Sequence, residues 1–132
     1  MYSHALRDVA ERGGIMESYG VLFSSRTGNT RALAEAIRAA LPREACVYFG
    51  ESGAAVPDAD TLYIGFWTDK GGADEATVRL LKTLRNRRIF LFGTAGFGGS
   101  EAYFQRILDN AQRSIDPSNT VIGTYMCQGR MP

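Results

Sequence analysis

The chain has 132 residues, a length that suits one domain built around one hydrophobic core. Hydrophobic residues make up 45% of it and charged residues 22%, as in ordinary globular proteins, and the net charge of +1 argues against a nucleic-acid surface. No apolar run reaches the roughly 20 residues that a membrane-spanning helix needs. Charged residues interrupt the first 17 positions, which therefore lack the pattern of a secretory signal.

Residues 1–17 precede the first predicted strand as an extension, and the domain proper is expected at 18–132. The apolar residues of the extension are spaced as in a short amphipathic helix. Two interpretations stay open. Either Met16 is the natural start and the end at Pro132 is a truncation, or the N-terminal helix covers a sheet face that is otherwise bare.

Five short apolar runs predict β-strands, at residues 19–24, 45–49, 61–66, 88–93 and 120–125. Unbroken apolar sequences such as LYIGF and IFLFG are typical of strands that are buried on both faces of a parallel sheet.

Three segments between these strands have apolar residues at helical spacing. The first runs from Leu33 to Leu41, the second begins at Asp74 as a helix cap, and the third begins at Ser100 in the same way. The alternation predicts a doubly wound α/β domain with a five-stranded parallel sheet, in which the helix after the last strand is absent.

Side chains with their own reactivity are few. Cys46 and Cys127 have neither CxxC nor metal-ligand spacing, so we expect two free thiols in a reducing compartment, the cytoplasm. His4 is the sole histidine and lies near the N-terminus, which argues against a Ser-His-Asp or Cys-His mechanism. Any redox chemistry would then come from a bound cofactor.

The loop after the first predicted strand is made of hydrogen-bond donors: Ser25, Arg26, Thr27, Gly28, Asn29 and Thr30. It leads into a helix N-terminus, where free N–H groups and the helix dipole attract an anion, and its glycine allows a ligand to approach the backbone. A phosphate monoester fits this chemistry. The alternative is a plain helix cap at Thr27, which explains only one of the hydroxyls. Neither a Walker sequence nor GxGxxG is present.

This hydroxyl-x-Thr-Gly-x-Thr sequence resembles the FMN-phosphate loop of flavodoxins, and the resemblance extends from about Tyr19 to Tyr125 in motif order and spacing. It implies the sheet order 2-1-3-4-5, with FMN bound where the first and third strands end. It also implies that the loops after the third and fourth strands hold the flavin ring.

The loop after the third strand, within FWTDKGGAD, would supply one side of the ring site: Trp67, Thr68, Asp69, Lys70 and Gly71. Trp67 either stacks on the ring or is the last core residue of its strand. Gly71 and Gly72 allow the backbone reversal that in flavodoxins brings a peptide to the flavin N5. Lys70 departs from the usual acidic surroundings: it would stabilise a reduced anionic flavin, attract an acidic partner, or be a solvated turn residue.

The loop after the fourth strand would supply the other side: Thr94, Ala95, Gly96, Phe97, Gly98 and Gly99. Phe97 would cover the ring or serve as a docking surface, with Tyr103 as a second aromatic that ordinary helix packing also explains. Cys127, Gln128 and Arg130 would lie at the same sheet edge, as a partner surface or as a plain tail.

The function implied by the resemblance is that of an FMN-binding electron-transfer protein which exchanges electrons with a partner reductase. The sequences FWTDKG, FLFGTAGFGGS and MCQG most resemble the short flavodoxins associated with bilirubin reduction, which implies a bilirubin reductase as partner. Two alternatives stay open: a self-sufficient NAD(P)H-dependent FMN oxidoreductase, and a flavodoxin-fold interaction module without flavin.

Overall fold

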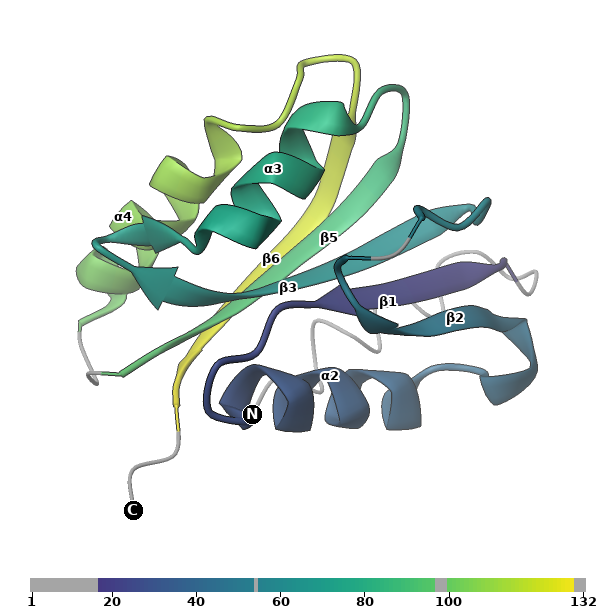
Figure 1. Ribbon diagram of the computed structural model, residues 1–132, viewed down its shortest axis with the longest axis horizontal. Helices are drawn as coiled ribbons and strands as arrows, with labels where there is room; N and C mark the ends of the chain where they lie inside the picture. The colour runs from purple at the N-terminus through teal and green to yellow at the C-terminus, as the bar shows by residue number, and fades with distance from the viewer. Residues whose placement is uncertain (1–16, 54, 97–99, 130–132) are drawn as a thin grey trace.

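A computed structural model describes residues 17–53, 55–96 and 100–129. Its main sheet has parallel strands in the spatial order β2-β1-β3-β5-β6 (Figure 1). These strands are β1 (Tyr19–Phe23), β2 (Cys46–Glu51), β3 (Thr61–Asp69), β5 (Arg88–Ala95) and β6 (Thr120–Gln128). Counted in chain order without the short β4, this is the order 2-1-3-4-5, so the expected doubly wound sheet is confirmed.

Helices cover both faces of this sheet. Helix α2 (Asn29–Ala40) lies on one face, and α3 (Glu75–Thr83) and α4 (Glu101–Gln112) lie on the other (Figure 1). A single 3-10 turn, η1 (Arg43–Ala45), leads into β2. The expected N-terminal helix, and the chain after Gly129, lie outside the described residues.

The N-caps of α3 and α4 are the residues that the sequence predicted, whereas that of α2 is not. Asp74 accepts a hydrogen bond from the Thr77 N–H at the start of α3, and Ser100 accepts one from the Tyr103 N–H at the start of α4. Both predicted caps are thus confirmed. Helix α2, however, begins after Gly28, so the alternative of a plain cap at Thr27 is wrong.

The core has two layers because alternate residues of each strand enter opposite faces. Tyr19, Val21 and Phe23 of β1 pack with the apolar residues of α2, whereas Leu22 packs in the layer under α3 and α4. Glycines admit large rings between neighbouring strands. A Cβ on Gly65 would collide with the Phe92 ring across the β3–β5 pair.

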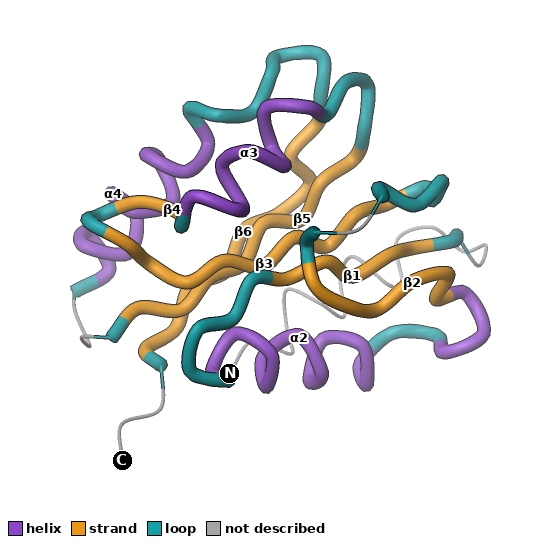
Figure 2. The backbone as a smooth tube through the Cα atoms, viewed as in Figure 1, coloured by secondary structure: helices purple, strands orange, loops and turns teal. Residues whose placement is uncertain are grey.

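Three strands run further toward the site than the sequence predicted. β3 continues to Asp69, β5 to Ala95 and β6 to Gln128, so several residues expected in loops are strand residues. The end of β3 then turns back as a hairpin with the two-residue strand β4 (Gly72–Ala73), which the sequence did not predict (Figure 2). Most of the added residues are polar or small, with Trp67 and Met126 as exceptions, and the apolar runs therefore break off before the strands end.

Candidate functional site

The segment between β1 and α2 is shaped by its own hydrogen bonds. The Oγ of Ser25 accepts from the backbone N–H of Gly28 (3.1 Å) and of Arg31 (3.3 Å). The Asn29 side-chain amide donates to the Thr27 Oγ1 (3.2 Å). Gly28 has a φ of +92°, in the left-handed region that favours glycine. The predicted loop thus curls tightly around the first turn of α2.

The start of α2 has room and charge for an anion. Among the described residues, no atom lies within 4 Å of a Cβ built on Gly28, so the space over this residue is open. Helix α2, which is described throughout, has no acidic residue in its first turn, and Gly28 has no side chain with which to cap it. The positive end of the helix dipole is therefore not neutralised by a carboxylate of the helix itself.

Thr30 points inward. The residue is buried, and its hydroxyl lies 3.3 Å from the Phe66 carbonyl oxygen and 2.9 Å from the Thr94 Oγ1. A carbonyl only accepts, so Thr30 donates to Phe66 and Thr94 donates to Thr30. The hydroxyl expected to bind phosphate is thus engaged in the core, where it joins the first turn of α2 to β3 and β5.

Thr68 adds a further link, because its hydroxyl donates to the Thr94 carbonyl oxygen (2.8 Å). Thr94 is buried in β5 rather than lying in a loop, and so is Ala95. Gly96 is exposed, whereas the predicted ring residues Phe97, Gly98 and Gly99 lie outside the described part of the chain. Threonine hydroxyls therefore fasten the ends of β3 and β5 to the first turn of α2.

Trp67 is held at the end of β3. Its backbone N–H donates to Asp74 Oδ1 (3.2 Å), and its carbonyl oxygen accepts from the Asp74 N–H (3.1 Å). The side chain is half-buried, and the Arg26 guanidinium carbon lies 5.3 Å from the centre of its ring. The loop after β1 and the end of β3, which are separate in sequence, therefore meet at this aromatic ring.

The hairpin after Trp67 reverses at Lys70 and Gly71, which have φ values of +53° and +82°. Asp69 pairs with Gly72 on either side of this two-residue turn, so the reversal lies one residue earlier than the predicted Gly71–Gly72. The Asn110 side-chain amide of α4 donates to the Gly71 carbonyl oxygen (2.8 Å). Lys70 is exposed, and the ion pairs found among the described residues do not include it.

The end of β6 closes the site on its remaining side. The N–H of Gly129 donates to the Ala95 carbonyl oxygen, and a Cβ on Gly129 would lie 2.7 Å from the Asn29 side-chain nitrogen. Burial raises the pKa of the Cys127 thiol, which disfavours its reactive thiolate form. Tyr103 is half-buried and packs against the core under α4, so the simpler interpretation of helix packing holds for it.

Sequence reasoning missed Asp74 as the anchor of Trp67, Asn110 as the anchor of the hairpin, and Gly129 beside the loop. The sequence did point to Asp74, as a helix cap. Its additional bond to Trp67 forms because the hairpin between them brings Asp74 back beside the end of β3. Asn110 lies in no sequence pattern that points to the site, whereas Gly129 ends the quoted MCQG sequence but was not singled out in it.

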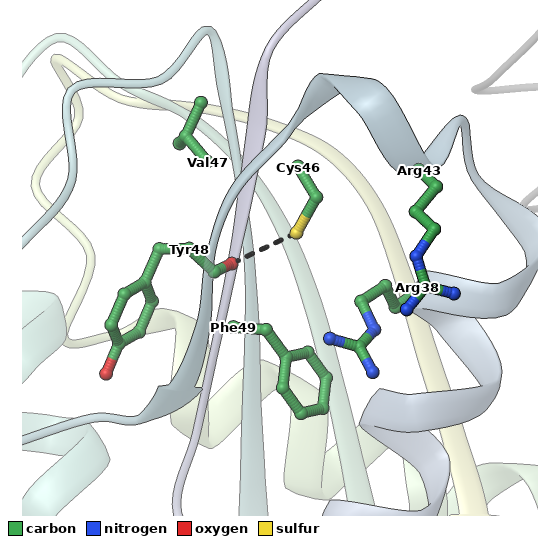
Figure 3. Close-up of a pocket in the computed structure, with 6 residues that line it drawn as sticks. All are labelled: Arg38, Arg43, Cys46, Val47, Tyr48 and Phe49. Carbon is green, nitrogen blue, oxygen red and sulfur yellow. Dashed lines mark hydrogen bonds between the residues drawn. The ribbon is translucent and has the colours of Figure 1, made fainter.

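A hollow lies at the far end of α2, away from Gly28. It has a volume of about 350 Å³ and is lined by Arg38, Arg43, Cys46, Val47, Tyr48 and Phe49 (Figure 3). The Arg38 guanidinium carbon lies 4.1 Å from the centre of the Phe49 ring, so Arg38 is already engaged in a cation–π contact with this ring. None of the residues predicted for the functional site lines this hollow.

No three His, Cys, Asp or Glu side chains of the described residues gather as a metal-ion site would require. No helix in the described ranges is both long enough and apolar enough to cross a membrane.

The sequence of this chain matches a protein-family model and two curated proteins. A family model described as "Flavodoxin domain" matches residues 20–132. The Clostridium symbiosum (strain WAL-14163) protein named flavodoxin-like domain-containing protein BilS is 45% identical over 130 residues, which cover 86% of this chain and 68% of that protein. A Clostridioides difficile (strain CD3) protein of the same name is 30% identical over 115 residues, which cover 84% of this chain and 65% of that protein. The chain thus spans about two thirds of the length of these curated relatives.

Solved structures show the same fold. A Lactobacillus acidophilus NCFM flavoprotein in complex with FMN superposes with a TM-score of 0.62 at 16% identity, covering 83% of this chain and 93% of that one. The two-electron reduced flavodoxin of Megasphaera elsdenii superposes with a TM-score of 0.57 at 25% identity, covering 86% and 88%.

Proposed function

This chain belongs to the flavodoxin-domain family, and from that premise we propose that it binds FMN and carries electrons to or from a partner reductase. The observation that carries the proposal is the open start of α2. Gly28 in the left-handed conformation, with open space above it and no carboxylate in the first turn of the helix, fits a dianionic phosphate. Flavodoxin-fold neighbours include a protein solved with FMN, which supports the same cofactor.

The proposal assigns the phosphate to one group of residues and the ring to two others. Ser25, Arg26, Thr27, Gly28 and Asn29 would hold the phosphate, and Thr30 would contribute through its backbone, since its hydroxyl is engaged inside. The ring would lie between the β3 end with its hairpin and the β5 end, in contact with residues drawn from Trp67, Thr68, Asp69, Lys70, Gly71, Thr94, Ala95, Gly96, Phe97, Gly98 and Gly99.

FMN, when bound, supplies one- and two-electron transfer. The chain's own residues position it. The hydroxyls of Thr30, Thr68 and Thr94 fasten the phosphate segment to both ring segments, so these segments are held together before a ligand arrives. Lys70 at the exposed hairpin turn would place a positive charge near the ring. That charge favours a reduced, anionic form of the cofactor or an acidic partner surface.

We extend the proposal to a partner in bilirubin reduction. Two observations support this extension: the chain's motifs resemble flavodoxins associated with that reaction, and the curated relatives carry the name BilS. The two half-buried free cysteines suit a reducing compartment, which supports a cytoplasmic site of action.

The test is an absorbance titration of the purified chain with FMN and with riboflavin. We expect FMN to bind much more tightly, because only FMN brings the phosphate that the start of α2 is suited to hold. Replacing Thr27 with Val should lower FMN affinity about tenfold, since a methyl group cannot donate the lost hydrogen bond, and should leave riboflavin affinity unchanged. Thr120→Val, on β6, is the matched control.

Equal affinity for the two flavins in the wild-type chain would contradict the assignment of the loop. A chain that binds neither would support the flavin-free interaction module. Rapid bleaching of bound flavin by NADPH alone, with no reductase present, would instead favour the self-sufficient oxidoreductase.

A further inference from the structure

Arg26 and Trp67 form a contact between the two halves of the proposed cofactor site. The Arg26 guanidinium carbon lies 5.3 Å from the ring centre of Trp67, which is within the range of a cation–π interaction. The Trp67 N–H donates to the Asp74 carboxylate and the Trp67 carbonyl accepts from the Asp74 N–H, and these two bonds fix the tryptophan backbone to the start of α3. Arg26 is exposed, and the ion pairs of the described residues do not include it, so the arginine is the partner that is free to move.

The other arginines that lie over aromatic rings behave differently. Arg31, in the first turn of α2, lies 5.7 Å from the Phe23 ring centre but also pairs with Glu35 at 3.3 Å. Arg38 lies over Phe49 at the opposite end of the same helix. Arg26 alone among these three belongs to the loop that surrounds the proposed phosphate position, one residue from Ser25 and two from Gly28.

We propose that Arg26 determines the preference of this chain for a phosphorylated flavin, by covering the Trp67 ring until a phosphate draws the guanidinium away. The proposal rests on the proposed function and goes beyond it. A guanidinium makes paired, charge-assisted hydrogen bonds to a phosphate, and these are stronger than a solvent-exposed cation–π contact. Arg26 therefore leaves Trp67 and binds the phosphate, and the exposed face of Trp67 can then stack on the flavin ring. A flavin without phosphate must displace Arg26 with no compensating bond.

Trp67 is the only tryptophan of the chain, so its fluorescence reports this contact directly. Inorganic phosphate, titrated into the full flavin-free chain at constant ionic strength, should change the Trp67 emission to a saturating value. Arg26→Gln should abolish this response, whereas Arg31→Gln, which removes a nearby ring-stacked arginine, should keep it. An unchanged emission in a wild-type chain that binds FMN would overturn the inference and leave the proposed function standing.

Flavin affinities give a second readout. In Arg26→Gln, riboflavin should bind more tightly than to the wild type, and the FMN-to-riboflavin preference should fall at least tenfold, about 1.4 kcal/mol at 25 °C. Arg26→Lys should lie between the two, because an ammonium keeps the charge but lacks the planar fork. Weaker riboflavin binding by Arg26→Gln would mean that Arg26 helps to hold the Trp67 ring in place for the flavin. That result would contradict the proposal that Arg26 covers the ring. Failure of the wild type to prefer FMN would defeat the proposed function itself.

Discussion

Helices α2 and α3 both begin at the edge of the sheet where parallel strands end, yet their first turns are completed in different ways. At α3, the buried Asp74 accepts from the Thr77 backbone and hydroxyl, and Glu75 adds a second carboxylate. At α2, Gly28 offers no side chain and no acidic residue follows in the first turn. The same dipole is neutralised by the protein at one helix and left for a ligand at the other.

The difference also concerns what each first turn stabilises. Asp74 joins α3 to the end of β3 through Trp67, so its carboxylate serves the fold. Thr30, in the first turn of α2, is joined to β3 and β5 by its buried hydroxyl, and on the outer side of the turn the Arg31 N–H donates to the uncharged Ser25 hydroxyl, which leaves the helix end without a carboxylate. A helix start that is anchored from inside can keep its outer surface open for binding.

The largest expected effect comes from removing the α3 cap. Asp74→Ala should lower the free energy of unfolding by about 3 kcal/mol, because the helix loses its N-cap and the half-buried Trp67 N–H and the buried Thr77 donors lose their acceptor. Urea unfolding followed by circular dichroism measures this change. Ser100→Ala, at the more exposed cap of α4, is the control and should lose only about 1 kcal/mol. Equal losses in the two variants would show that the second bond of Asp74, to Trp67, contributes nothing.

A smaller effect is expected at the start of α2. Gly28→Ala should destabilise the flavin-free chain by about 1 kcal/mol, since φ is +92° there and an L-residue is strained in that region. The reason is conformational and not steric, because a Cβ at this position meets no described atom within 4 Å. Gly28→Asn should therefore lose less than Gly28→Ala, as asparagine tolerates the left-handed region better. The reverse ranking would mean that the added side chain collides with its surroundings.

The smallest expected effect on stability comes from making α2 resemble α3. Thr27→Asp should stabilise the flavin-free chain by about 0.5 kcal/mol at low salt, because its carboxylate meets the positive end of the helix. The same carboxylate would repel a phosphate, so the preference for FMN over riboflavin should disappear. Thermal unfolding and flavin titration of one protein preparation measure both results. A variant that gains stability and keeps its FMN preference would separate the helix end from phosphate binding.

Much of the fold was predictable from local pattern. Apolar runs located every strand of the main sheet, and the caps at Asp74 and Ser100 were found because a helix cap is a property of neighbouring residues. The predicted ends of β3 and β6 come too early, since both strands finish on polar residues, Asp69 and Gln128, which do not continue an apolar run. The hairpin reversal at Lys70 was missed by one residue because two adjacent glycines offered equivalent turns.

Residue pattern alone is enough to predict a doubly wound sheet and a loop of hydrogen-bond donors placed before the first helix. The tertiary structure decided which of those donors face outward. Thr30 turns inward because an acceptor on β3 and a donor on β5, 36 and 64 residues away in the chain, meet it there. Asn110 and Arg26 likewise acquire their partners, Gly71 and Trp67, only when separate segments come together at one sheet edge. Periodicity and capping are local properties, whereas the direction of a side chain depends on neighbours that the fold alone supplies.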